Sequence, residues 1–179
     1  MSLSVELRGV TCTVRSYRTA DADSLARHGN NRAIWLNLRD RFPHPFFADD
    51  CARYIAHCLE ATLQASFAID VAGEAVGGIS FHAGTDIERV GAELGYWVGE
   101  AFWGRGIATD AVRLLSDYAL GEREYERLFA LPFARNAASA RVLEKAGYLR
   151  EGTLRRSCLK NGVLEDQLLY AKLRAGREG

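Results

Sequence analysis

Residues 93–109 read ELGYWVGEAFWGRGIAT. The pattern predicts the end of a strand, a turn rich in glycine and then the start of a helix. Gly104 and Gly106 carry no side chain, which lets a ligand contact the backbone there. The free amides up to Thr109 lie at the positive end of the helix, which is a binding site for anions, and Arg105 adds a cation. The turn therefore predicts a ligand that carries phosphates.

This turn differs from two other phosphate-binding motifs. A P-loop needs G-x-x-x-x-G-K-[ST], and the chain has no such run. A Rossmann turn needs G-x-G-x-x-G, but Thr109 stands at the sixth position, and no acid follows the next predicted strand. A tight strand-to-helix turn without a ligand is the alternative.

The rest of the chain predicts a mixed α/β fold around this turn. Strands are expected at residues 10–17, 66–71, 75–81, 90–98, 128–133, 148–154 and 163–173. Helices are expected at 19–30, 48–63, 106–120 and 137–146. Segment 37–47 contains Pro43 and Pro45 and is expected to be a loop. With no linker or repeat, the chain is expected to form one domain over residues 1–179.

Composition restricts the class of partner. The 179 residues carry 23 basic and 23 acidic side chains, and a net charge of zero argues against nucleic acid as the main partner. No stretch approaches the roughly 20 apolar residues that span a bilayer, so no membrane is expected. The N-terminus lacks a basic segment followed by an apolar one, so no secretory signal is expected and the cytoplasm is the default compartment. The cysteines lack zinc-site spacing and no metal is expected; they are Cys12, Cys51, Cys58 and Cys158.

The strand and turn together resemble a known motif. ELGYWV at 93–98 followed by WGRGIAT at 103–109 resembles motif A of the GNAT superfamily of N-acetyltransferases, usually written Q/R-x-x-G-x-G/A. Gly106 and Ala108 match its last two fixed positions. Trp103 stands where many members have Gln or Arg, and a Trp at this position is common in the RimJ/RimL-type branch.

Two further segments extend the resemblance to this branch. They are NAAS at 136–139 and EKAGY at 144–148, and the similarity runs from about residue 10 to residue 173. The implied GNAT fold has a central mixed, twisted sheet of about seven strands. It has helices on both faces and one splayed parallel pair of strands.

The resemblance implies acetyl-CoA as co-substrate, bound where the parallel strands splay. The pyrophosphate is then expected on the amides of 104–109, and the pantetheine arm along 96–98. The Val98 amide is expected to stabilise the oxyanion that develops on the thioester. The expected cofactor-binding residues are Tyr96, Trp97, Val98, Trp103, Gly104, Arg105, Gly106, Ile107, Ala108, Thr109, Asn136 and Ser139. Asn136 is equally a candidate N-cap for the next helix.

The implied reaction is direct attack by an amine on the thioester, so some group has to accept a proton. Glu93 is the expected base, because it lies on the same strand face as Gly95 and Trp97. An exposed strand carboxylate is the alternative. Ser139 and Tyr148 are candidates to protonate the leaving thiolate, although Tyr148 is equally a packed aromatic at the start of a strand.

Segment 37–43, NLRDRFP, resembles a segment that lies over the acceptor side of the cleft in the same branch. Arg39, Asp40 and Arg41 are therefore candidates to select the acceptor, with solvated loop charges as the alternative.

His44 and His82 are further candidate bases.

The chain departs from the pattern of this branch in the strand after residue 154. RimL-like ribosomal protein acetyltransferases have a Glu near the position of Cys158, and a neutral thiol does not replace a carboxylate base. Ribosomal specificity is therefore not carried over to this chain.

The predicted function is transfer of acetyl from acetyl-CoA to a primary amine. An α-amine has a pKa of about 7.7 to 8.0 and a lysine side chain one of about 10.4, so an α-amine is easier to deprotonate. A peptide or protein N-terminus is therefore the favoured acceptor, with a polyamine or aminoglycoside as the alternative. A non-catalytic acyl-CoA sensor is the alternative from another class, and a homodimer is left open.

Overall fold

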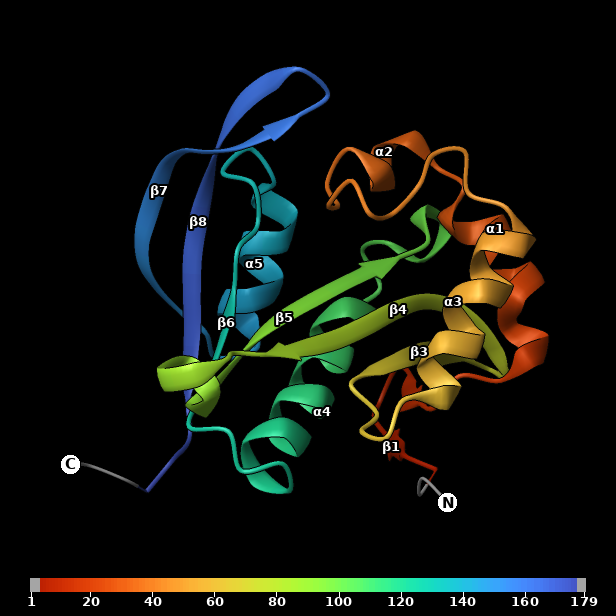
Figure 1. The fold of residues 1–179 in the computed structure, drawn as a ribbon, viewed down its shortest axis with the longest axis horizontal. Coiled ribbons are helices and arrows are strands. Elements are labelled where there is room, and N and C mark those ends of the chain that lie inside the picture. Colours follow the sequence, from red (N-terminus) through yellow and green to blue (C-terminus); the bar gives the residue numbers. More distant parts are fainter. Residues whose placement is uncertain (1–3, 177–179) are drawn as a thin grey trace.

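One mixed sheet forms the centre of the molecule in the computed structural model, which describes residues 4–176 (Figure 1). Its strands are β1 (Glu6–Arg8), β2 (Thr13–Arg15), β3 (Ser66–Val71), β4 (Glu74–Ala83), β5 (Gly91–Val98), β6 (Arg127–Ala130), β7 (Leu149–Lys160) and β8 (Val163–Leu173). The spatial order is β1-β2-β3-β4-β5-β6-β8-β7, and only β5 and β6 pair in parallel among these strands. Residues 1–3 and 177–179 of the predicted domain lie outside the described residues.

The predicted mixed sheet is confirmed, with eight strands where about seven are expected. The difference lies in the first strand: residues 10–17 were expected as one strand, but β2 covers only part of it and β1 pairs with it as a separate strand. β1 has only three residues and no buried side chain, which leaves no alternation to detect. β3 and β8 have the predicted bounds, while β7 continues six residues beyond its predicted end.

Helices cover both faces of the sheet, as predicted. They are α1 (Ala22–Gly29), α2 (Arg32–Trp35), α3 (Ala48–Glu60), α4 (Ile107–Gly121) and α5 (Ala137–Lys145). Short 3₁₀ turns also occur: η1 (Thr19–Asp21), η2 (Asp86–Val90) and η3 (Glu100–Phe102). Figure 1 shows α1 and α3 on one side of β4 and β5, with α4 on the other.

Two apolar clusters hold these layers together. On the α4 and α5 face, Leu115 and Leu143 pack with sheet residues such as Leu128, all fully buried. On the α1 and α3 face, Leu25 and Ile55 pack in a smaller cluster. Because side chains alternate along a strand, β5 contributes residues to both clusters and separates the two faces of the sheet.

A buried charge network also attaches the N-terminal segment to the sheet on the side of α1. Arg15 on β2 donates to both carboxylate oxygens of Asp21 at 2.8 Å and to Asp70 on β3 at 2.7 Å. Burial alone would raise the pKa of Asp21, but the hydrogen bonds from Arg15 and from the Arg18 amide together lower it.

The β7–β8 hairpin rises beside the loop that follows α2 (Figure 1). Its turn is the predicted Asn161-Gly162 pair, and both residues have positive φ, at 49° and 79°. Within residues 4–176, no helix has the length and apolar character needed to cross a membrane.

Candidate active site

The parallel strands β5 and β6 separate after three residue pairs. Gly91 to Glu93 pair with Arg127 to Phe129, and β5 then runs on to Val98 without β6 beside it. The chain after β6 follows β8 instead, because Leu168 donates to the Pro132 carbonyl at 2.9 Å. The predicted splay is therefore present, and it leaves one edge of β5 free.

The backbone of β5 presents hydrogen-bonding groups to this gap. Gly99 donates to the Val76 carbonyl on β4 at 2.8 Å, and Val98 pairs opposite Gly77. In an antiparallel pair, alternate residues bond to the partner strand, so the amides of Val98 and Tyr96 are directed away from β4. The Val98 amide therefore faces the splay, and the Val98 carbonyl accepts from Trp103 Nε1 at 2.7 Å.

A cavity of about 430 Å³ opens between the splayed strands. Every predicted cofactor-binding residue except Arg105 lines it: Tyr96, Trp97, Val98, Trp103, Gly104, Gly106, Ile107, Ala108, Thr109, Asn136 and Ser139. We call it the cofactor cavity. The guanidinium of Arg105 instead lies over the ring of Phe102, with 5.1 Å between its central carbon and the ring centroid.

The start of α4 leaves backbone amides available to this cavity. Gly104 and Gly106 have φ of 73° and 78°, the left-handed region that glycine adopts without strain. Gly106 is the N-cap of α4, and no side chain caps the helix there. The amides of the first turn, at Ile107 to Thr109, therefore remain free to bind an anion.

A pair of hydroxyl-bearing side chains, Tyr96 and Ser139, also lines the cofactor cavity. Tyr96 Oη and Ser139 Oγ are 2.7 Å apart, and burial raises the pKa of Tyr96 above its usual range. Asn136 accepts from the Ser139 amide at 3.1 Å, so it is the N-cap of α5 and also lines the cavity. Ser139 is thus held by its backbone and by its side chain.

Tyr148 lies apart from these groups. Its side chain is 2% exposed in the core between the sheet and α4, and its hydroxyl bonds to Ser116 at 2.8 Å. Burial raises the pKa of Tyr148 to about 12. It lines neither cavity described here, so its position fits the packed aromatic and not the proton donor.

A second cavity, of about 470 Å³, lies on the α1 and α3 face of β5. Glu93, Gly95 and Trp97 line it, as their shared strand face predicts, together with Ser80 and His82 of β4. It shares Leu38, Tyr96 and Trp97 with the cofactor cavity, so the two meet at β5. We call it the acceptor cavity.

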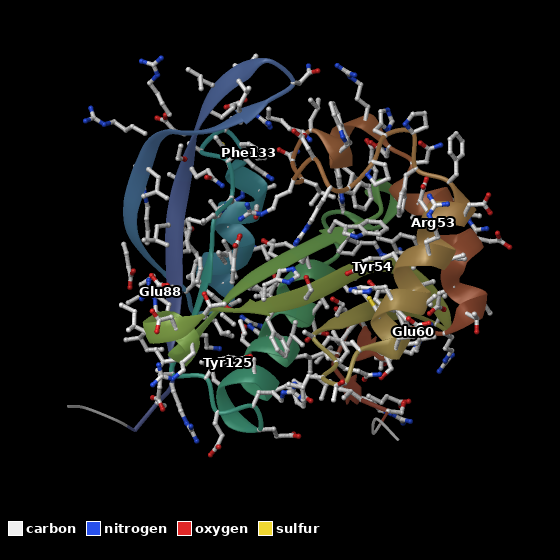
Figure 2. The ribbon with its side chains drawn as sticks, viewed as in Figure 1. Arg53, Tyr54, Glu60, Glu88, Tyr125 and Phe133 are labelled. Atoms are coloured by element: carbon white, nitrogen blue, oxygen red, sulfur yellow. The ribbon has the colours of Figure 1, made fainter. Side chains whose placement is uncertain are left out.

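α3 and the loop after α2 form the other walls of the acceptor cavity. Arg53 and Tyr54 come from α3, which lies at the right in Figure 2, with Phe133 and the β7–β8 hairpin at the upper left. Arg39 and Arg41 come from the loop, whereas Asp40 between them does not line the cavity. The α3 residues were missed in sequence, because nothing local marks which helix face covers a cavity.

Both candidate bases in the acceptor cavity are held by arginines. The guanidinium of Arg39 forms an ion pair with Glu93. Arg41 Nη2 lies 2.7 Å from His82 Nε2, which therefore acts as acceptor, since arginine has only donors. Burial lowers the pKa of His82, and the charge of Arg41 lowers it further. His44 instead stacks on Trp35, with 5.6 Å between ring centroids.

The loop with these arginines is attached to the β7–β8 hairpin. Lys160 Nζ donates to Asp40 at 2.7 Å and lies 3.9 Å from the ring centroid of Trp35, with only 2% of its side chain exposed. Arg135 donates to the Leu36 carbonyl at 2.7 Å. Cys158 lies in the same hairpin and lines neither cavity described here; burial raises the pKa of its thiol.

Comparison with known proteins agrees with this geometry. Residues 12–149 match the family model described as an acetyltransferase (GNAT) domain. The chain is 46% identical over 82 residues to YjcK of Bacillus subtilis, which is described as a probable N-acetyltransferase. The aligned segment covers 46% of this chain and 45% of that relative. The chain is also 30% identical over 100 residues to the ribosomal-protein-serine acetyltransferase of Escherichia coli. That segment covers 56% of this chain and 55% of the relative. The aligned part thus spans about half the length of these curated relatives.

A solved structure extends the likeness to nearly the whole fold. RimJ of Mycobacterium smegmatis, solved in complex with CoA-disulfide, superposes with a TM-score of 0.81 at 25% identity. The match covers 95% of this chain and 86% of that one. With the splayed strands, the glycine turn and the family match together, this chain belongs to the GNAT acetyltransferase family.

Proposed function

We propose that this protein transfers the acetyl group of acetyl-CoA to the α-amine of a peptide or protein N-terminus. One observation carries the proposal: the cofactor cavity and the acceptor cavity meet at Tyr96 and Trp97. An acetyl donor in one cavity and an amine in the other would therefore approach each other across β5.

The residues present fit acetyl-CoA. The uncapped amides at Ile107 to Thr109 suit its pyrophosphate, and the free edge of β5 suits the amides of its pantetheine arm. Acetyl-CoA supplies an acetyl group activated as a thioester. The Val98 amide, directed into the splay, is placed to stabilise negative charge on the thioester oxygen, as a donor of this kind does in acyl transfer.

Proton transfer is assigned to two groups. As the amine nitrogen bonds to the acetyl carbon and the carbon–sulfur bond breaks, the nitrogen gives a proton to Glu93. The thiolate receives a proton from Ser139, whose hydroxyl is held at 2.7 Å from that of Tyr96. Ser139 lines the cofactor cavity and Glu93 the acceptor cavity, which is the side each role requires.

The charges around the acceptor cavity favour a peptide over a polycation. Among the described residues that line it, three are arginines (Arg39, Arg41 and Arg53) and two are carboxylates (Asp50 and Glu93). A polyamine or aminoglycoside carries several positive charges, which such a lining repels. An α-amine also deprotonates more easily than a lysine side chain, by about 2.5 pKa units.

The test is acetyl transfer to peptides, polyamines and aminoglycosides, with the product read by mass. Acetylated peptide N-termini are the expected result, and product on polyamines alone would contradict the proposal. A thermal melt with acetyl-CoA at about 100 times its Kd should add roughly 2.7 kcal/mol of stability. That shift without product on any acceptor would instead favour a non-catalytic sensor.

A further inference from the structure

Two arginines, Arg39 and Arg41, line the acceptor cavity from one loop. Each contacts a group able to accept a proton: Arg39 contacts Glu93, and Arg41 contacts His82. Glu93 and His82 are direct partners across the β4–β5 ladder. The loop thus covers two neighbouring proton acceptors with two guanidinium groups.

The arginines are held in this orientation by the residue between them. Asp40 points away from the cavity to Lys160, whose ammonium also lies against the Trp35 ring. Residues 39–42 form a turn in which the Phe42 amide donates to the Arg39 carbonyl at 3.0 Å, so the contact of Asp40 with Lys160 fixes the position of the turn that carries Arg39 and Arg41. The side chains of Arg39 and Asp40 are paired in this way and also remain 55% and 72% exposed to solvent.

Arg41 differs from the other arginines of the acceptor cavity. Arg53 pairs with Asp50 on its own helix, and Arg39 pairs with Glu93. Within residues 4–176, no carboxylate lies within ion-pair distance of Arg41, whose hydrogen-bond partner is the imidazole of His82. The guanidinium of Arg41 therefore has no acidic partner among the described residues and is available to an anionic group of a ligand.

The wall beside this cation is aromatic. Phe42, Phe46 and Trp97 all line the cavity and pack against one another, with ring centroids 4.3 Å apart for Phe42 and Phe46, 5.5 Å for Phe42 and Trp97, and 6.3 Å for Phe46 and Trp97. Attraction between opposite charges is stronger beside such a wall than in open water. The surroundings thus favour a charged partner for Arg41.

We propose that the acceptor carries a carboxylate close to its reacting amine, and that this carboxylate binds Arg41 and Arg39 and so releases His82 and Glu93. The inference rests on the proposed function and specifies its substrate class. Glu93 and Tyr96 are three residues apart on β5, which is about 10 Å. An extended peptide advances about 3.5 Å per residue, so the carboxylate belongs to one of the first three residues of the acceptor peptide.

Release of Glu93 links recognition to reaction. While Arg39 is paired with Glu93, the guanidinium occupies the carboxylate oxygen that would have to accept the amine proton. An acidic acceptor competes for the guanidinium and leaves the carboxylate free to take the amine proton. A neutral acceptor leaves both arginines in place, so it should react more slowly even when it is bound.

The experiment compares matched peptides whose second and third residues are aspartate in one and asparagine in the other. The wild-type protein should show at least a tenfold higher kcat/KM for the acidic peptide. Arg41→Gln and Arg39→Gln should remove most of that preference, and Arg41→Glu should reverse it towards a peptide with lysine at these positions. Arg53→Gln is the matched control: it should keep the wild-type ratio, because Asp50 already occupies that guanidinium.

The outcomes separate the two proposals. Equal kcat/KM for both peptides in the wild-type protein would overturn the inference and leave the proposed function standing. Product on polyamines with none on any peptide would overturn the proposed function itself. Melting temperatures of the four variants, with and without acetyl-CoA, identify any variant that has lost its fold. If one of the glutamine variants has, the inference is decided by whether Arg41→Glu prefers the lysine peptide over the acidic one.

Discussion

The two cavities that meet at β5 are built from different parts of the chain. The cofactor cavity relies on backbone groups: the amides of the α4 N-terminus, two glycines with positive φ and the free edge of β5. The acceptor cavity relies on side chains from separate segments, among them Arg39, His82 and Glu93. The first should therefore respond to changes of backbone conformation, and the second to changes of charge.

The attachment of the two helical layers differs in the same way. α4 is held by apolar contacts, with Ala111, Val112 and Leu115 fully buried. The segment that leads into α1 is held in addition by the ion pairs of Arg15 with Asp21 and Asp70. Buried charges thus support the acceptor side of the sheet, and apolar packing supports the cofactor side.

The largest expected effect follows from that difference. Asp21→Asn should lower the free energy of unfolding by about 3 kcal/mol, because it leaves the charge of Arg15 only partly compensated in a buried site. Urea unfolding at pH 7 measures it. Asp117→Asn is the control: its ion pair with Lys172 is 75% exposed on the aspartate side, and the change should stay within about 0.5 kcal/mol.

Acid should affect the same network. The pKa of Asp21 is lowered in the fold, so its stabilising contribution is present above the unfolded pKa of about 3.9 and is lost as the pH falls through the folded value. Unfolding measured from pH 6 to pH 3 should show a smaller loss in Asp21→Asn than in the wild type. Parallel curves would show that Asp21 is not responsible.

The next effect tests the boundary between the cavities. Ser139→Ala should lower kcat about 100-fold, because it removes the proton donor, while acetyl-CoA still raises the melting temperature. Steady-state kinetics with a saturating peptide measures kcat. Tyr148→Phe is the informative contrast, since its hydroxyl bonds only to Ser116 in the core: it should lose about 1 kcal/mol of stability and keep its kcat. A large fall of kcat in Tyr148→Phe would return the donor role to that residue.

The cofactor cavity could be predicted from the sequence to a greater extent than the acceptor cavity. The cofactor cavity depends on one contiguous stretch, 93–109, in which glycines and a change of period are visible directly. Even there, the position of Arg105 over Phe102 was not predicted, because the direction of a side chain next to a left-handed glycine depends on its neighbours. The strand face of Glu93, Gly95 and Trp97 could be predicted, because alternation is a local rule.

The acceptor cavity depends on contacts between distant segments. Lys160 reaches Asp40 across 120 positions, and Arg41 reaches His82 across 41. No local period records such pairs, so the segment 37–43 could be assigned to the acceptor side only by resemblance. Tyr148 shows the reverse case: its residue type suits a proton donor, and only the fold shows that α4 covers it.

A smaller effect is expected from the glycine turn. Gly106→Ala places a side chain at φ of 78°, which costs about 1–2 kcal/mol and turns the following amides away from the cofactor cavity. Acetyl-CoA should bind about tenfold more weakly by calorimetry, while the preference for acidic peptides is kept. Gly121→Ala is the control, because this glycine ends α4 in open space and its binding of acetyl-CoA should not change. If Gly106→Ala also lost the preference for acidic peptides, the cofactor cavity would influence how the acceptor cavity selects its peptide.

The smallest expected effect concerns the contact that holds the loop over the acceptor cavity. Lys160→Met removes the ion pair with Asp40 and the contact with the Trp35 ring, which together we expect to contribute about 1 kcal/mol to the position of Arg39 and Arg41. KM for the acidic peptide should therefore rise about fivefold, with acetyl-CoA binding unchanged. Lys160→Arg keeps the charge and should restore most of the loss. If both variants bind the peptide as the wild type does, the loop is positioned by Arg135 and its contact with the Leu36 carbonyl, and the hairpin tip has no part in recognition.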